Sequence, residues 1–136
     1  MKQPTAVAIP ETHLDLLQRE TKAYAVLALT LADHSPQATP IWFDWDGTHI
    51  VINTARGRVK DRILHLKPKV AVTIMDPKDP ERYLQLRGHV VAESEMDGYE
   101  QICALREKYQ GDGNFPKRPG EVRVTYKILP ENAYGE

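Results

Sequence analysis

The chain has 136 residues, 18 basic and 19 acidic side chains and a formal net charge of −1. This length fits one domain, residues 1–136, which can bury a sizeable core without disulfides or metals. The only cysteine, Cys103, excludes an internal disulfide. No apolar run approaches the roughly 20 residues that span a bilayer, and the N-terminus lacks the apolar core of a signal peptide. We therefore expect a cytoplasmic protein that has no membrane partner.

The first half of the chain predicts a helix followed by three strands. Residues 9–20 carry an early proline, a threonine that can cap a helix, and leucines on one side, and so predict a helix. The apolar run 23–32 fits a buried strand. Predicted strands over 38–45 and 48–54 flank Asp46-Gly47, a dipeptide typical of two-residue hairpin turns.

The second half continues with a helix over 57–66, where Val59, Ile63 and Leu66 fall on one apolar face. The remaining elements are a strand over 69–76, a strand over 82–94 with a bulge at Gly88, a helix over 95–109 whose start is weakened by Gly98, a polar loop over 111–120, and a strand over 121–129.

This pattern of strands predicts the fold class. Six strands joined mostly by hairpins, with a few short helices, favour an antiparallel barrel over a parallel sheet. The edges of such a small barrel must be covered or paired, and a homodimer does this. Trp42 and Trp45 would lie on opposite faces of the strand over 38–45, so that one of them faces outward and adds apolar surface for a partner.

A basic stretch at residues 53–64, NTARGRVKDRIL, is the clearest functional signal. Arg56, Arg58, Lys60 and Arg62 occupy four of seven positions around a glycine in an otherwise balanced chain. The stretch fits a solvated helix face. It also fits a phosphate site, in which Thr54 and a helix N-terminus add donors to the charges. Nucleic acid is disfavoured, because the domain is not basic and no aromatic residues are interleaved.

Other catalytic patterns are missing from the sequence. The five histidines show no metal-ligand spacing, so no metal is predicted, and there is no nucleophile elbow, dinucleotide fingerprint or P-loop. Cys103 lies among apolar neighbours in a predicted helix and fits a core position. An enzyme with this sequence would rely on a cofactor for its chemistry.

Three stretches carry a family resemblance that covers nearly the whole chain. They are AYAVLALTLADHSPQATPIWFDWDGTHIVINTARGRVKDRIL, KPKVAVTIMDPKDPERYLQLRGHVV and VRVTYKILPENAYGE. In their order they resemble the split-barrel flavin/deazaflavin oxidoreductases, the superfamily that includes pyridoxamine 5′-phosphate oxidase. The resemblance implies a mainly β, six-stranded antiparallel split barrel and a homodimer with cofactor sites at its interface. It also implies that the strand end at Thr54 and the lysine six residues on, Lys60, hold the cofactor phosphate.

The resemblance also bears on the cofactor. The FMN oxidases of this superfamily carry an arginine on the strand before the Asp-Gly hairpin, where this chain reads ATPIWFDW. The motif T-P-I-W is typical of the branch that uses the deazaflavin coenzyme F420, whose acidic tail would suit extra basic residues. That branch often has asparagine where Ile63 stands. The resemblance thus implies F420, with FMN as the alternative, held by a site at Pro40, Trp42, Asn53, Thr54, Arg56, Gly57, Arg58, Val59 and Lys60.

The implied activity is an F420-dependent reductase that passes a hydride to a conjugated small molecule, such as a quinone or a biliverdin-like tetrapyrrole. An FMN-dependent oxidase and a non-catalytic cofactor-binding protein are the alternatives. Catalytic residues are not assigned, although Tyr126 or an arginine near the pocket would be able to donate a proton.

Overall fold

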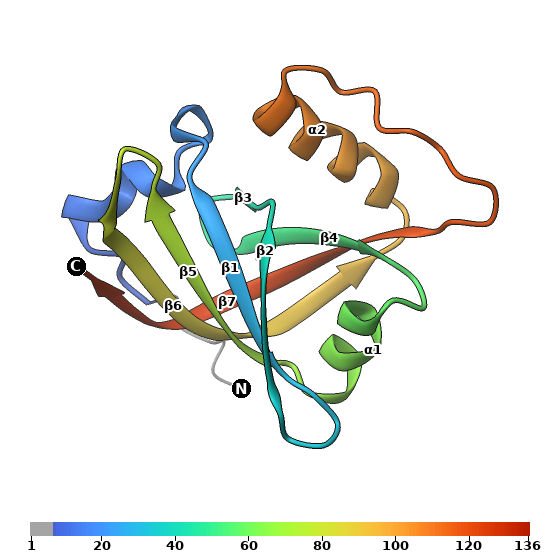
Figure 1. The fold of residues 1–136 in the computed structure, drawn as a ribbon, viewed down its shortest axis with the longest axis horizontal. Helices are drawn as coiled ribbons and strands as arrows, with labels where there is room; N and C mark the ends of the chain where they lie inside the picture. The colour runs from blue at the N-terminus through green and yellow to red at the C-terminus, as the bar shows by residue number, and fades with distance from the viewer. Residues whose placement is uncertain (1–6) are drawn as a thin grey trace.

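The computed structural model describes residues 7–136, and its strands form one antiparallel sheet. Within these residues the sheet has seven strands in the order β2-β1-β5-β6-β7-β4-β3. The strands are β1 (Tyr24–Thr30), β2 (Pro36–Ile41), β3 (Asp44–Trp45), β4 (Ile50–Ala55), β5 (Lys69–Asp76), β6 (Asp79–Ser94) and β7 (Arg123–Gly135). The sheet curls into a half-barrel (Figure 1), so the mainly β fold is confirmed.

Alternation along the strands builds the core. β1 and β5 bury every second side chain, including Leu27 and Ile74. These side chains pack in one cluster with Tyr126 of β7 and with Leu16, which comes from the N-terminal segment. The apolar run predicted as a buried strand over 23–32 therefore becomes β1, the strand between β2 and β5.

The N-terminal helix is shorter and tighter than the sequence predicts. Two 3-10 helices, η1 (Glu11–Leu17) and η2 (Arg19–Thr21), replace the helix expected over 9–20. No side-chain hydrogen bond caps η1, and Thr12 Oγ1 instead contacts the ring of His13 at 2.8 Å. The tighter winding turns Leu16 inward and leaves Leu14 exposed.

The strand predicted over 38–45 is broken into β2 and β3 at Trp42 and Phe43, which explains why seven strands are found where six were expected. Phe43 turns its side chain into the core and is fully buried. The two tryptophans therefore do not lie on opposite faces of one strand, and both are half-buried.

The hairpin between β3 and β4 is also looser than predicted. Trp45 pairs with Ile50, so four residues rather than two form the turn. Asp46 closes it, because its Oδ1 accepts hydrogen bonds from the backbone N–H groups of Thr48 and His49.

β6 and β7 form a long antiparallel pair. Gly88 lies at an irregularity in their register, as predicted, and a Cβ on it would stand 2.1 Å from the carbonyl oxygen of Leu129. β7 continues beyond the predicted end at residue 129, and its last residues pair with the start of β6, as Gly135 does with Leu84.

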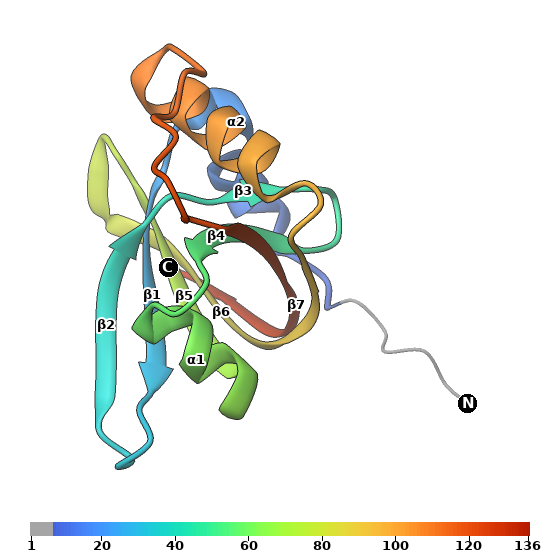
Figure 2. The same cartoon turned by 90° about the vertical axis from the view of Figure 1, so that its right-hand side faces the viewer.

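Two α-helices, α1 (Val59–Leu66) and α2 (Gly98–Gln110), lie on opposite sides of β4 (Figure 2). Only part of the predicted apolar face of α1 is buried: Ile63 packs inward, whereas Leu66 is 70% exposed and Val59 is exposed as well. None of the helices within residues 7–136 has the length and apolar character that crossing a membrane requires.

Gly98 is needed at the start of α2. A Cβ on this residue would stand 2.0 Å from the carbonyl oxygen of Arg123, at the start of β7. The absence of a side chain thus lets α2 begin directly against the sheet, and this close approach places α2 over β4.

Candidate functional site

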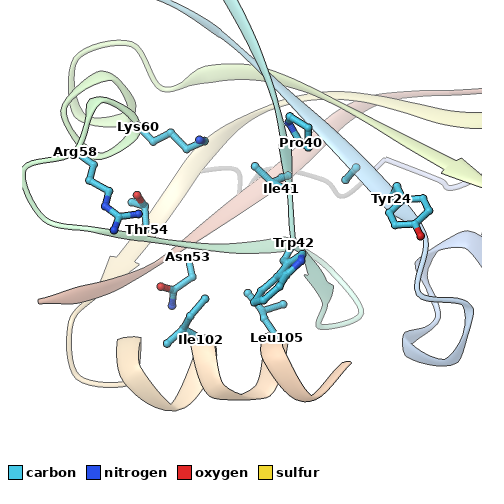
Figure 3. A pocket seen from close by; sticks show the side chains of 11 residues that line it. Tyr24, Pro40, Ile41, Trp42, Asn53, Thr54, Arg58, Lys60, Ile102 and Leu105 are labelled. Carbon is cyan, nitrogen blue, oxygen red and sulfur yellow. The ribbon is translucent and has the colours of Figure 1, made fainter. Parts of the chain in front are cut away.

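A cleft of about 350 Å³ opens between α1, α2 and the ends of β1, β2 and β4 (Figure 3). Its walls come from five separate elements of the chain. The lining residues are Tyr24, Ala25, Pro40, Ile41, Trp42, Asn53, Thr54, Arg58, Lys60, Ile102 and Leu105. Arg58, Thr54 and Lys60 gather at one end of the cleft, and Tyr24 and Trp42 lie toward the other.

The basic end is built where β4 stops and α1 begins. Thr54 is a buried residue near the end of β4, and Gly57, at φ 88°, makes the turn that leads to Arg58 and Lys60. Burial lowers the pKa of Lys60, and the neighbouring charge of Arg58 lowers it further, with no acidic group opposing the shift. Within residues 7–136, Lys60 is thus a half-buried cation without a counter-ion, which is a property of an anion site.

A chain of hydrogen bonds through Asn53, Arg123 and Glu121 fixes the wall of the cleft next to its basic end. Asn53 donates from its amide nitrogen to the carbonyl of Gly98 at 2.8 Å and accepts from Arg123 Nε at 2.9 Å. Glu121 accepts from Arg123 at 3.4 Å and from Arg58 at 3.3 Å. These contacts tie the starts of α2 and β7 to β4 and hold Arg58 at the rim, where half of its side chain remains exposed.

The aromatic end is fixed by stacking. The indole of Trp42 stacks on the ring of Tyr109 with centroids 5.6 Å apart and planes 10° from parallel. Tyr24, 61% exposed, stands at the opening. Ile102 and Leu105 from α2 form the apolar floor. The cleft therefore joins a cationic end to a largely apolar, aromatic end.

Six of the nine residues predicted for the site line this cleft. They are Pro40, Trp42, Asn53, Thr54, Arg58 and Lys60. The other three, Arg56, Gly57 and Val59, belong to the same turn but do not line it. The backbone N–H of Gly57 is already used, because it donates to Asp61 Oδ2 at 3.0 Å.

Arg56 points into a separate network of acidic groups. Its guanidinium donates to Asp61 Oδ1 at 2.9 Å, to Glu93 at 2.8 Å and to Glu95 at 3.0 Å. This arginine is therefore paired within the fold, on the far side of the turn from the cleft.

Tyr126 lies in that same network and does not line the cleft. Its hydroxyl donates to Asp61 at 2.5 Å and lies 3.1 Å from the Nδ1 of His65. Burial, reinforced by the hydrogen bond to Asp61, raises the pKa of Tyr126 far above its usual range. A phenol held in this way is a poor proton donor, and it is directed away from the candidate site.

Asp61, His65 and Glu93 bring three possible metal-ligand atoms within 4.8 Å of one another, a grouping that the sequence spacing did not reveal. Arg56 occupies oxygens of both carboxylates, and His65 Nε2 lies 3.0 Å from Glu93. The group is thus already satisfied as an ion-pair network.

Sequence reasoning missed the contribution of β1 and α2 to the cleft. Tyr24, Ala25, Ile41, Ile102 and Leu105 complete its walls. Ile102 and Leu105 are apolar residues of the predicted helix over 95–109, but the sequence carries no signal that they face this cleft. Ile63, which stands where the F420-using branch often has asparagine, does not line the cleft, because its side chain packs into the core.

A curled antiparallel half-barrel with short helices is the architecture of the split-barrel fold. Residues 9–131 match the pyridoxamine 5′-phosphate oxidase family, and the chain belongs to this family.

Solved structures give the same fold. An F420 reductase is 30% identical, with a TM-score of 0.81, over 93% of this chain and 98% of that one. A Listeria innocua protein named as a candidate pyridoxamine 5′-phosphate oxidase is 20% identical over 92% of this chain and 95% of its own, with a TM-score of 0.69. General stress protein 26 from Bacillus anthracis is 20% identical over 90% and 93%, with a TM-score of 0.61. No curated protein matches the chain.

Proposed function

We propose that the protein is an F420-dependent oxidoreductase that reduces a conjugated small molecule, such as a quinone or a biliverdin-like tetrapyrrole. The observation that carries this proposal is the charge of Lys60 at the basic end of the cleft, which no acidic group among residues 7–136 balances. A phosphate group would supply the missing negative charge, and the hydroxyl of Thr54 is placed to donate to it.

The cleft fits the remainder of such a cofactor. Its volume of about 350 Å³ lies in the range of small-ligand pockets, which begins near 300 Å³. Apolar and aromatic walls suit a planar ring system, and Arg58 at the rim suits an acidic tail that continues toward solvent. Arg56 is already paired with carboxylates and is not part of this proposal.

The reduced deazaflavin supplies a hydride when it is bound. The chain's own residues bind the cofactor and orient its ring. Lys60 and Thr54 anchor the phosphate and so fix how far the ring enters the cleft. Trp42 and Leu105 exclude water along the walls, which protects a reactive hydride donor. Tyr24 at the opening is placed to contact the acceptor.

The end of β2 supports F420 over FMN. Pro40, Ile41 and Trp42 form the wall at the position where the oxidases that bind FMN are expected to carry an arginine. The 30% identity to a protein named F420 reductase points the same way. An FMN-dependent oxidase is the second candidate, because the family is named for a pyridoxamine 5′-phosphate oxidase.

We further propose that the protein is a homodimer in which a second copy completes the cleft. β2 and β3 are the two edges of the sheet, and Tyr24 is largely exposed at the mouth of the cleft. Exposed apolar side chains at Leu66 and Val122 add surface suited to a partner. Light scattering should give twice the chain mass, and a mass near 15.5 kDa would contradict the dimer.

Parallel titrations of F420 and FMN at equal ionic strength test the cofactor. We expect F420 to bind more tightly, and FMN binding of equal or greater affinity would reverse this order. Turnover with reduced F420 and a panel of quinones and tetrapyrroles tests the activity. Tight F420 binding with no oxidation by any acceptor would identify a cofactor-binding protein instead of a reductase.

A further inference from the structure

Lys108, near the end of α2, is buried although it is a lysine. It is 3% exposed, and its Nζ donates to the carbonyl oxygen of Phe43 at 2.6 Å. The same nitrogen lies 4.0 Å from the ring centroid of Phe43 and 4.9 Å from that of Tyr109. The lysine thus fastens α2 to the break between β2 and β3.

Tyr109 forms a second attachment at the same place. Its hydroxyl donates to the carbonyl of Ala23 at 2.9 Å, and its ring carries the stacked indole of Trp42. Trp42 precedes Phe43 and lines the cleft. The position of this aromatic wall therefore depends on how the Phe43 backbone is held against α2.

The charged and titratable groups that face Lys108 are Asp44, Arg19 and Tyr109. Asp44 Oδ1 is 3.7 Å away, but Asp44 Oδ2 is already paired with Arg19 at 2.8 Å. Burial lowers the pKa of Lys108 to about 8, and Asp44 only partly offsets this effect. A buried charge with so little compensation is unfavourable, and an apolar side chain of similar size would avoid that penalty.

The stability of the fold therefore does not explain a lysine at this position. Its contact with the Phe43 carbonyl does. We propose that Lys108 is a positioning residue, which fixes Trp42 as the aromatic wall of the cleft by holding the Phe43 carbonyl against α2. The proposal rests on the proposed function only in taking the cleft as the site where a planar cofactor binds.

The test uses Trp45→Phe as background, so that Trp42 is the only tryptophan. Lys108→Met in this background removes the hydrogen bond and both cation–ring contacts. The matched control is Lys127→Met, because Lys127 pairs with Asp46 in the β3–β4 turn at 3.4 Å but does not contact Trp42 or Phe43. Acrylamide quenching of Trp42 fluorescence and the Kd for F420 are measured for each variant.

We expect Lys108→Met to increase quenching of Trp42 and to raise the Kd for F420 by about three- to tenfold, the cost of re-ordering an aromatic side chain on binding. Lys127→Met should leave both quantities unchanged. Quenching and Kd in Lys108→Met that equal those of Lys127→Met would overturn the proposal.

A pH series with Lys108 intact provides a second test that needs no folded Lys108→Met protein. Deprotonation weakens the bond to Phe43, because a charge-assisted hydrogen bond is about twice as strong as a neutral one. Quenching should therefore rise with a midpoint near pH 8, whereas burial raises the pKa of Tyr109 to about 12 and keeps its phenol neutral. Quenching that stays flat from pH 7 to about pH 9.5 would refute the positioning role.

These readouts separate the two proposals. If the Lys127→Met control does not bind F420, the proposed function fails, and the fluorescence of Trp42 without ligand still decides the role of Lys108.

Discussion

Replacing Lys60 with alanine tests the candidate site at its most informative residue. The side chain is half-buried at one end of the cleft, and its pKa is lowered by burial and by Arg58. If a cofactor phosphate accepts a charge-assisted hydrogen bond from it, the loss is roughly 1.5–3 kcal/mol. This corresponds to a Kd that rises about ten- to a hundredfold.

The free energy of unfolding should change little or rise slightly in Lys60→Ala. The lowered pKa means that the folded protein without ligand disfavours the charged lysine, so removing the charge relieves a small penalty. Affinity and stability therefore move in different directions, which separates a binding role from a structural one. Isothermal titration with F420 and thermal unfolding without it measure the two quantities.

Arg62→Ala is the matched control for charge. Arg62 is an exposed cation on the same helix, but it lies at another surface pocket and not at the cleft. The Arg62→Ala variant reproduces the long-range electrostatic effect on F420 affinity of removing one positive charge. That effect should fade with added salt. Wild-type affinity in Lys60→Ala, or an equal loss in both variants at high salt, would refute the phosphate assignment.

Two other substitutions and one pH series have distinct expected outcomes. Arg56→Ala should lower stability by about 1–3 kcal/mol, because it leaves Asp61 with fewer partners, and should leave F420 affinity nearly unchanged; chemical denaturation and titration check this. Gly98→Ala should destabilise by about 1–3 kcal/mol, since its Cβ would meet the Arg123 carbonyl, and an unchanged Tm would contradict the close approach. The pKa of Lys108 is about 8 when folded and 10.5 when unfolded, so the unfolded chain binds more protons between these values and stability rises with pH there. The free energy of unfolding of the wild type, relative to that of Lys108→Met, should therefore rise by roughly 2–3 kcal/mol from pH 7 to pH 10. A difference that stays constant over this range would contradict the prediction.

The basic end of the cleft was predictable because its parts are adjacent in the chain. Thr54 lies one residue before the end of a strand of strongly apolar pattern, Gly57 makes the turn, and Lys60 follows in the first turn of α1. Local geometry alone brings these residues together. The resemblance then implied that Lys60 contacts a phosphate. The structure places Lys60 at the cleft, where none of the described residues 7–136 forms an ion pair with it.

The opposite end of the cleft could not be predicted in this way. Ile102 and Leu105 reach it because α2 begins directly against β7 at Gly98, a long-range contact that periodicity does not encode. The aromatic run at Trp42 and Phe43 looks like continuous strand. The strand is interrupted at these two residues, and the Phe43 carbonyl there accepts a hydrogen bond from Lys108, 65 residues further along the chain.

The basic stretch has two roles that its sequence does not distinguish. Arg56 and Arg58 flank a glycine whose positive φ reverses the chain. Arg56 therefore meets Glu93 of β6, and Arg58 lines the cleft. Asp61 locks this turn by accepting from both Arg56 and the Gly57 backbone. The near-zero net charge of the chain is therefore unevenly distributed in space. Acidic groups neutralise Arg56, whereas none of those in the part of the chain that the structure describes neutralises Lys60. The contacts of Asp61 thus fix the turn from which Lys60 enters the cleft, where we propose that it holds a phosphate.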